Sequence, residues 1–320
     1  MKSLPSPSVL FCLLATLAVA SCDSSHRSTA QGASVARSSV SAFDEGDKRA
    51  SLVERTVAPA ESAGETAKMA AVEAKHTPEP ARDVRMPTEW MADLDWSGSQ
   101  RVAHAKSSKG AVVQKLFDDA GVNFPPHDVL YRVFKQEEEF EVWAGDEGKP
   151  LRLIATYGIC AASGVLGPKR AEGDRQVPEG YYKVGYFHPA SSYYLSAQVD
   201  YPNASDRLRG GPSPGGDILI HGRCASIGCV SMTDERIEEI YLVGWGAFMK
   251  GQPTHIHIFP ARDFGPLLSD PKLSEHHAFW REIEPGLLAF DKTHRIPAVR
   301  IEKDGRYVVT PAADPEQPTD

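Results

Sequence analysis

The chain has 320 residues and a formal net charge of -8. Its length allows two average domains, and the sequence leads us to expect one folded domain. The negative charge and the lack of a dense Lys/Arg patch argue against nucleic acid as a partner, because phosphate binding requires a basic face. After the first 22 residues, nothing in the sequence predicts a membrane span.

Residues 1–22, "MKSLPSPSVLFCLLATLAVASC", have the pattern of a secretory signal. They carry one basic residue, Lys2, and an apolar run over residues 9–20 that is too short to cross a membrane. Residues 18–20 fit an ordinary cleavage site, while residues 19–22 resemble a bacterial lipobox that would place a lipid on Cys22. We favour the lipobox and expect an exported periplasmic protein anchored to the cell membrane or the outer membrane; a soluble periplasmic product is the alternative.

Residues 23–106 are rich in Ser, Ala, Glu and Thr, and Phe43 is the only aromatic residue between positions 23 and 89. Such a segment buries too little apolar surface to offset its ordering entropy, so we expect a disordered tether. Residues 107–126 follow as an N-terminal helix. Its apolar residues share one helical face, and Gly121 is typical of a helix end.

The rest of the chain predicts a mostly β catalytic domain with flanking helices over residues 127–262. Alternating apolar residues predict strands, and a Thr233 N-cap with acids behind it predicts a helix. The Gly/Pro-rich stretch between them predicts short strands separated by long surface loops. Residues 263–310 are expected to form an α/β extension packed on this domain, and residues 311–320 a tail.

Five cysteines are present, of which Cys12 and Cys22 belong to the signal. The folded part therefore contains an odd number: Cys160, Cys224 and Cys229. In an oxidising exported compartment, two of the three can pair and leave one thiol free.

One stretch, "ILIHGRCASIGCVSMTDERIEEIY" at residues 218–241, places His221, Cys224 and Cys229 within nine residues. The H-x2-C-x4-C spacing is not a common zinc pattern and no further ligand pair follows, so we expect no metal. The cysteines also lack the C-x-x-C spacing of a redox pair. The alternatives that remain are a cysteine nucleophile with its base, and a buried histidine and cysteine that only pack.

The hypothesis of a cysteine nucleophile requires the chain to turn sharply at Gly222 and to return at Cys229, so that the imidazole and the sulfur come within hydrogen-bond distance. A protonated His221 and the helix start near Thr233 would then lower the pKa of the thiol. Backbone N–H groups at Gly228 and Cys229 would form an oxyanion hole.

The same stretch resembles the active-site signature of the L,D-transpeptidase (YkuD-type) catalytic domain, in which an H-G dipeptide precedes S-x-G-C. The short spacing and the following M-T-D are most similar to the YafK-like branch of that family. Upstream, "GVLGPKRAEGDRQVPEGYYKV" and "YPNASDR" are similar to other segments of that branch. The resemblance covers about residues 130–260 and extends towards residue 309.

This resemblance implies a β-sandwich that acts without a cofactor on peptidoglycan stem peptides. Cys229 would attack an amide at the diaminoacid residue, and His221 would serve as base. The carbonyl of Gly222 would orient the imidazole, while Ser226 and Gly228 would shape the nucleophile turn. A disulfide between Cys160 and Cys224 is expected, since it leaves the nucleophile free as the chemistry requires.

Two positions depart from the wider family, which usually has His before Gly-Cys and Arg soon after. This chain has Ile227 and Ser231 there. Three alternatives to transpeptidation therefore stay open: an amidase that releases a peptidoglycan-attached lipoprotein, an L,D-carboxypeptidase, and a non-catalytic wall-binding lipoprotein. We expect a monomer.

Several charged loop residues are candidates for holding the carboxylates of a stem peptide, with solvated loop charges as the alternative. They are Lys169, Arg170, Arg175, Asp206 and Arg207. His255 and His257 alternate along a strand and resemble a metal pair, but we expect an ordinary strand face because no third ligand is near in sequence. Tyrosines at 181, 182, 193 and 194 are expected to pack.

Overall fold

The structure is a computed structural model that describes residues 97–312. The predicted signal, the lipidation site at Cys22, the tether up to residue 96 and most of the tail lie outside the described residues. Within residues 97–312, no helix has the length and apolar character needed to cross a membrane.

Eight strands form one mixed sheet in the order β3-β2-β1-β8-β4-β5-β6-β7. Two neighbouring pairs are parallel, β1 with β8 and β6 with β7, and the other pairs are antiparallel. The strands are β1 Asp128–Phe134, β2 Glu139–Gly145, β3 Arg152–Gly158, β4 Gly180–Ser191, β5 Tyr194–Val199, β6 Leu219–His221, β7 Val230–Ser231 and β8 Thr254–Phe259.

The sheet curls at β4, which is twelve residues long. Its first part, residues 180–183, pairs with β8, and its second part, from residue 184, pairs with β5, with a register shift between Val184 and Tyr186. One buried core contains side chains from both halves of the sheet, among them Tyr131 of β1, Leu195 of β5 and Ile220 of β6. The expected mostly β architecture with flanking helices is confirmed as a curled mixed sheet.

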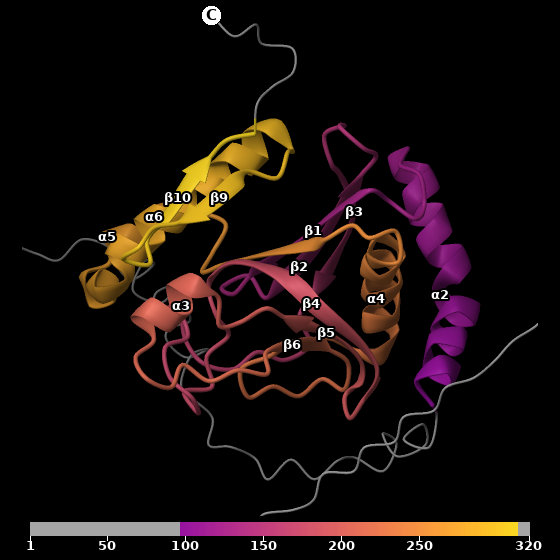
Figure 1. The fold of residues 1–320 in the computed structure, drawn as a ribbon, viewed down its shortest axis with the longest axis horizontal. Helices are drawn as coiled ribbons and strands as arrows, with labels where there is room; N and C mark the ends of the chain where they lie inside the picture. Colours follow the sequence, from indigo (N-terminus) through magenta and orange to yellow (C-terminus); the bar gives the residue numbers. More distant parts are fainter. Residues whose placement is uncertain (1–96, 313–320) are drawn as a thin grey trace, which may run out of the picture. The chain divides into compact units, whose positions relative to one another are not determined.

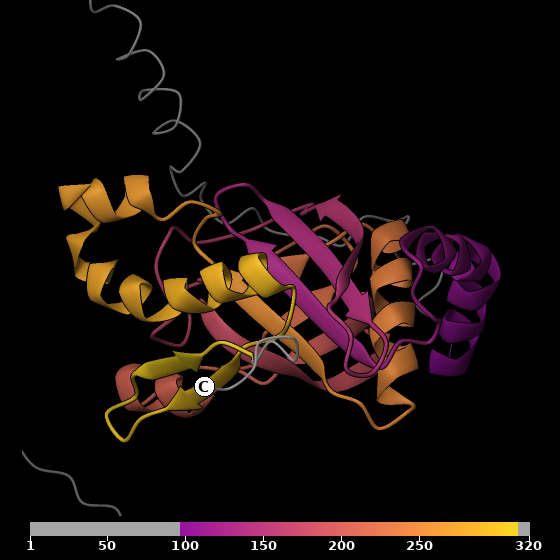
Figure 2. The same ribbon diagram turned by 90° about the horizontal axis from the view of Figure 1, so that it is seen from above.

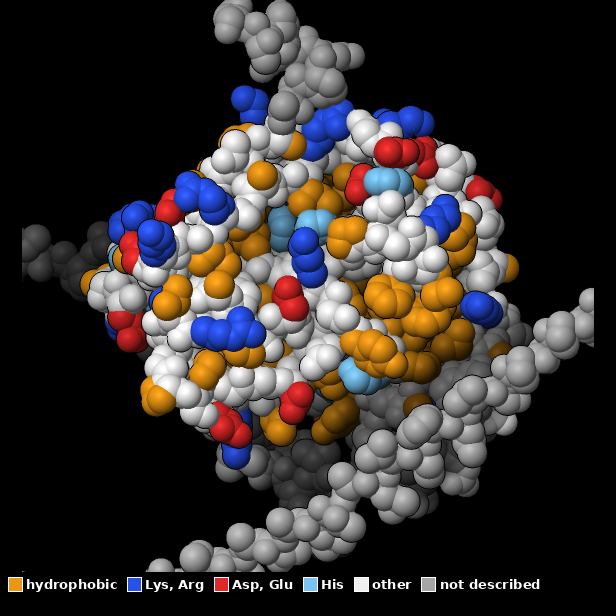
Figure 3. Space-filling view, in the orientation of Figure 1, with side chains coloured by type: hydrophobic (Ala, Val, Ile, Leu, Met, Phe, Trp, Pro, Cys, Tyr) orange, Lys and Arg blue, Asp and Glu red, His pale blue; other side chains and the backbone are white. Residues whose placement is uncertain are grey.

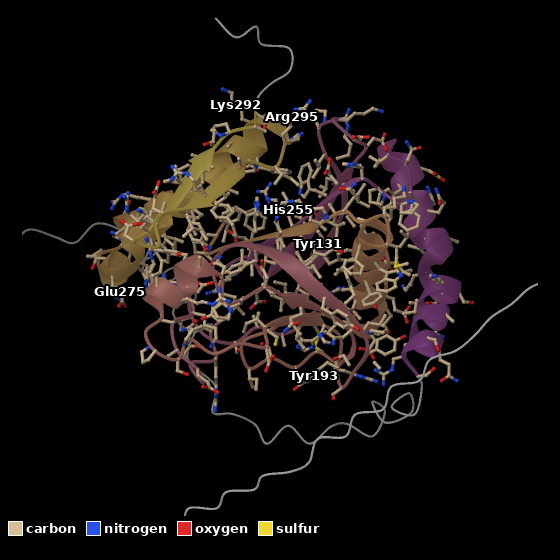
Figure 4. All side chains as sticks on the ribbon, viewed as in Figure 1. Tyr131, Tyr193, His255, Glu275, Lys292 and Arg295 are labelled. Atoms are coloured by element: carbon tan, nitrogen blue, oxygen red, sulfur yellow. A yellow bond between two sulfur atoms is a disulfide. The ribbon has the colours of Figure 1, made fainter. Side chains whose placement is uncertain are left out.

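Two helices cover one end of the sheet, α2 (Gly98–Ala120) and α4 (Asp234–Phe248). Both views show them side by side (Figures 1 and 2). The Tyr131 hydroxyl donates to the Ile240 carbonyl of α4 at 2.6 Å and fastens that helix to the sheet (Figure 4). Thr233 caps α4, as the sequence predicts.

The start of α2 corrects a boundary, because residues 98–106 were expected in the tether and are helical. Ser97 caps the helix and exchanges hydrogen bonds with Gln100, which is a capping box. Few residues of the first turns are buried, so they show little apolar periodicity in the sequence. The end of the helix is as predicted, with Gly121 in the left-handed region at φ 67°.

The region predicted as short strands separated by loops contains β4 and β5, of which β4 is longer than expected, and a short helix, α3 (Ala204–Arg209). The residues after 263 form α5 (Gly265–Ser269), a 3-10 turn η2 (Pro271–Leu273), α6 (Ser274–Thr293) and the hairpin of β9 (Ala298–Ile301) with β10 (Tyr307–Thr310). Figures 1 and 2 place α6 and this hairpin at the opposite end of the sheet from α2.

The C-terminal extension packs on the sheet through its own buried cluster. Trp280 of α6 is fully buried with Phe134 and Phe259 of the sheet. Its indole N–H donates to the Glu179 carboxylate at 2.7 Å, so the buried acid is satisfied from the extension.

Candidate active site

His221 and Cys229 lie on adjacent parallel strands. His221 is the last residue of β6 and pairs with Ser231 of β7, while Cys229 directly precedes β7. Extending the register by one residue places Cys229 beside Leu219, whose backbone N–H donates to the Cys229 sulfur at 3.4 Å. Because Leu219 and His221 are two residues apart on β6, this contact brings the sulfur to the strand that carries the imidazole.

The His221 ring is buried, with 1% of its surface exposed. Its Nδ1 lies 2.5 Å from the Gly222 carbonyl oxygen. A carbonyl only accepts hydrogen bonds, so Nδ1 carries the proton and Nε2 holds the lone pair of a base. The Tyr193 ring packs on the imidazole at 4.5 Å between centroids, from the turn between β4 and β5 (Figure 4).

Burial lowers the pKa of His221, and the hydrogen bond with the Gly222 carbonyl opposes that shift. The imidazole is therefore neutral at rest. Tyr193 was expected only to pack, and its contact with His221 makes it part of the site.

Cys229 is a free, half-buried cysteine. Its thiol donates to the Asp217 carbonyl at 3.7 Å, and among residues 97–312 no hydrogen bond joins it to His221. Burial raises the pKa of the Cys229 thiol, although the hydrogen bond from Leu219 lowers it. The expectation of a depressed thiol pKa is wrong in this structure because desolvation outweighs the favourable contacts, and the resting pair is a thiol and a neutral imidazole.

Ser226 closes the turn that carries the nucleophile. Its hydroxyl donates to the Cys229 carbonyl at 2.7 Å and accepts from the Gly228 N–H at 3.2 Å. Gly228 has φ 129°, and a Cβ there would lie 3.3 Å from the Gln176 carbonyl. Because Ser226 engages the Gly228 N–H, that group is not a free oxyanion donor as the sequence suggested. We call residues 221–229 the nucleophile turn.

Asp234 is a site residue that sequence reasoning missed. Its carboxylate accepts from the Arg223 backbone N–H at 2.8 Å and pairs with the Arg223 guanidinium at 3.1 Å. Arg223 is buried and has φ 70°, so a charge at the first residue of α4 holds a strained backbone. A Cβ on Gly222 would collide with this carboxylate, which explains the glycine whose carbonyl orients His221.

A disulfide joins Cys160 to Cys224, as expected from the resemblance, with their Cα atoms 5.2 Å apart. Cys160 follows β3, and its N–H donates to the Ser231 carbonyl of β7 at 2.8 Å. The bond therefore fastens the nucleophile turn to the opposite edge of the curled sheet.

Four of the charged residues near the turn are engaged with one another, and we call Lys169, Arg170, Asp174 and Asp206 the charged cluster. The Lys169 ammonium is 4% exposed and donates to Asp174 at 2.6 Å. Arg170 pairs with Asp206 at 3.5 Å. These contacts favour a structural role for Lys169, Arg170 and Asp206 over the carboxylate binding that the sequence suggested.

Asp206 is 1% exposed, and burial raises its pKa to about 6. Its carboxylate accepts from the Tyr182 hydroxyl at 3.1 Å and caps α3 together with Asn203. The two other candidates, Arg175 and Arg207, are exposed. Arg175 lies against the nucleophile turn, since its backbone is 3.7 Å from the position of a Cβ on Gly228.

His255 and His257 lie in β8, and His257 is buried with its ring edge against Tyr181. Burial lowers the pKa of His255 to about 4. The described residues contain no group of three or more side chains that could hold a metal ion.

Residues 131–243 match the family model of the L,D-transpeptidase catalytic domain, YkuD. The chain is also 37% identical over 185 residues to YafK of Escherichia coli strain K12, a candidate L,D-transpeptidase. That alignment covers 57% of this chain and 74% of the relative.

Solved structures give weaker likenesses. The helical cell shape determining protein Pgp2 of Campylobacter jejuni is 16% identical with a TM-score of 0.35, over 59% of this chain and 80% of that one. A mutant of it aligns over 48% of this chain and 57% of its own, at 21% identity and a TM-score of 0.35. An L,D-transpeptidase of Xylanimonas cellulosilytica is 16% identical with a TM-score of 0.26, over 45% and 68%.

Proposed function

The chain belongs to the L,D-transpeptidase (YkuD) catalytic-domain family, and on that premise we propose that it is a cysteine acyltransferase acting on peptidoglycan stem peptides in the cell envelope. The observation that carries the proposal is the pairing of one free thiol with one oriented imidazole. Cys229 is the free cysteine of residues 97–312 while the other two are joined in a disulfide. His221 has its Nδ1 proton fixed on the Gly222 carbonyl, which leaves Nε2 as a base.

The reaction begins with proton transfer from the Cys229 thiol to His221 Nε2. The resting thiol bonds the Asp217 carbonyl, so the cysteine side chain must rotate, or a water molecule must bridge the two groups, before this proton moves. The thiolate attacks an amide carbonyl at the diaminoacid residue, and the imidazolium protonates the departing amine as the C–N bond breaks. A thioester results.

An amine acceptor then attacks the thioester, gives its proton to His221 and releases the new amide. The proton returns from the imidazolium to the cysteine sulfur. The raised pKa of Cys229 and the lowered pKa of His221 keep the pair neutral until substrate enters, so the ion pair forms during the reaction rather than before it.

Hydrolysis at the same site is a second candidate, supported by the two positions that depart from the wider family. Ile227 is 68% exposed beside the nucleophile, and Ser231 is fully buried in β7. Neither supplies a positive charge that would hold an acceptor carboxylate. Water would then release a shortened stem or a peptidoglycan-attached lipoprotein. For either reaction we propose an exported protein anchored through Cys22.

The test is product analysis by mass spectrometry with purified peptidoglycan, with and without attached lipoprotein. New crosslinks support transpeptidation; shortened stems or released protein support hydrolysis. Intact parent protein should gain the mass of an acyl group on incubation with muropeptides, whereas Cys229→Ala should give neither adduct nor product. Binding of muropeptides by the parent without any adduct or product would contradict an enzymatic function and favour a wall-binding protein.

A further inference from the structure

A groove runs between α2 and α4, well apart in sequence from the nucleophile turn. It consists of two hollows of about 470 and 360 Å³ that share Lys106 and Trp245 in their walls. The first ends at Gly98 and Pro189, and the second reaches Phe124. We call the two hollows together the helix groove.

The helix groove is apolar with a basic rim. Its walls include Val102, Val113, Leu242 and Met249, and Met249 is 64% exposed. Figure 3 shows hydrophobic side chains gathered over the region where Figure 1 draws α4. Of the described residues that line the hollows, Lys106 and Lys250 are the charged ones.

The segment directly before α2 has the complementary chemistry. Residues 89–96, "EWMADLDW", contain two tryptophans, a methionine and a leucine, whereas residues 23–88 contain one aromatic residue. The same eight residues carry three acids, Glu89, Asp93 and Asp95, and no Lys or Arg. An apolar, acidic segment therefore precedes an apolar groove with a basic rim.

The segment also ends at residue 96, next to the first hollow, and it is long enough to extend along the groove. Ser97 caps α2, and Gly98 and Ser99 line the first hollow. Along α2, the distance from residue 98 to residue 113 is about 22 Å at the helical rise. Eight residues in an extended conformation span at most about 28 Å. Eight residues are therefore enough to reach from Ser97 to the second hollow.

We propose that residues 89–96 occupy the helix groove, with apolar side chains in the two hollows and acidic side chains against Lys106 and Lys250. The segment before residue 97 would then be packed against the catalytic domain instead of being connected to it through the backbone alone. Such a contact would fix the place on the domain surface where the preceding segment leaves it.

The test is hydrogen exchange read by mass spectrometry on the full-length protein. In the parent, amides of residues 89–96 should exchange at least about tenfold more slowly than an unstructured peptide of that sequence. The charge reversal Lys106→Glu with Lys250→Glu should remove this protection. Adding Asp93→Lys and Asp95→Lys to the reversed protein should restore it. Lys115→Glu, on α2 but outside the groove, is the matched control and should leave the protection unchanged.

Exchange of residues 89–96 at the unstructured rate in the parent would overturn the proposal. It would also be overturned if protection disappeared on dilution, because a second copy would then fill the groove. Protection that appears only with phospholipid vesicles would instead assign the groove to a membrane surface. The reversed charges lie on exposed lysines, and the exchange of β1 amides in the same data shows whether each variant is folded.

Discussion

Candidate site residues lie in both the nucleophile turn and the charged cluster, and their polar groups are paired in the cluster but not with each other in the turn. In the turn, the half-buried Cys229 thiol and the buried His221 ring share no hydrogen bond within residues 97–312, and the ring uses Nδ1 to bond the Gly222 carbonyl. In the cluster, Lys169 is paired with Asp174, and Arg170 with Asp206. Groups that are not fully paired remain available for chemistry. A charged loop residue is therefore a weaker guide to the active site than a neutral base near a free thiol.

The largest expected effect is the loss of activity on replacing His221, compared with His255, whose pKa is also lowered by burial. His221→Gln should lower kcat/KM by about 10²- to 10⁴-fold, because it removes the base that accepts the thiol proton. His255→Gln is the matched control: that ring is also neutral, through burial in β8, but it does not contact the turn. Steady-state kinetics on a muropeptide substrate measures both. Comparable losses in the two variants would argue against a special role for His221.

The second prediction concerns how the turn is held. The Cys160–Cys224 bond spans a sequence separation of 64 residues. On the chain-entropy account, Cys160→Ser with Cys224→Ser should lower the free energy of unfolding by about 4 kcal/mol. Urea denaturation measures this change, and Cys229→Ser is the control that should leave stability nearly unaltered. An unchanged unfolding midpoint in the double variant would show that the bond does not fasten the turn.

The charged cluster should instead affect how the free energy of unfolding depends on pH. Burial raises the pKa of Asp206 to about 6, so between about pH 4 and pH 6 the folded state holds a proton that the unfolded state has lost. The contribution of this group is favourable below pH 4 and falls by roughly 2 to 3 kcal/mol as the pH rises through 6.

Asp206→Asn removes that titration while keeping an oxygen that can accept from Tyr182. Unfolding free energies of parent and variant, measured in urea from pH 4 to pH 7, should therefore diverge, with the variant gaining relative to the parent as pH rises. Parallel curves would mean that Asp206 titrates normally. Muropeptide turnover by the variant should stay within about threefold of the parent, because the cluster is not placed in the reaction.

Much of the fold could be predicted because apolar and polar residues alternate along several segments of the sequence, although most side chains of β1, β2 and β8 are buried in the structure. The alternation predicted β1, β2 and β8, and Thr233 predicted the start of α4. The full length of β4 was not predicted, since its twelve residues cross from one half of the sheet to the other and include a proline and two glycines. The first turns of α2 were hidden because little of them is buried.

For the site, the spacing of the turn identified Cys229 and His221, but three physical properties could not be read from it. Desolvation of the thiol depends on packing from distant strands, and it reversed the expected pKa direction. The engagement of Gly228 by Ser226 depends on the local backbone path. The clamp of Asp234 on Arg223 joins residues eleven positions apart across a left-handed turn.

That clamp gives a smaller prediction. Asp234→Asn keeps an oxygen for the Arg223 N–H but loses the ion pair, so kcat should fall about tenfold with KM unchanged. Loosening the turn weakens the Gly222 carbonyl bond that holds up the pKa of His221, so the acid limb of the pH–rate profile should move to lower pH. Glu235→Gln, an exposed acid in the same helical turn, is the control. An unshifted profile with reduced kcat would indicate a purely structural role for Asp234.

The smallest expected effect is a change in KM, which tests whether a charged loop residue contacts the substrate. Arg175 is exposed and lies against Gly228, whereas Arg207 is exposed on α3. If Arg175 binds a stem-peptide carboxylate, Arg175→Gln should raise KM by roughly three- to tenfold with kcat unchanged, because an exposed ion pair contributes about 1 kcal/mol and fades with salt. Arg207→Gln should change neither constant. A KM that rises equally in both variants would reflect the general charge of this face, and the carboxylate would then have to be held by backbone N–H groups of the nucleophile turn.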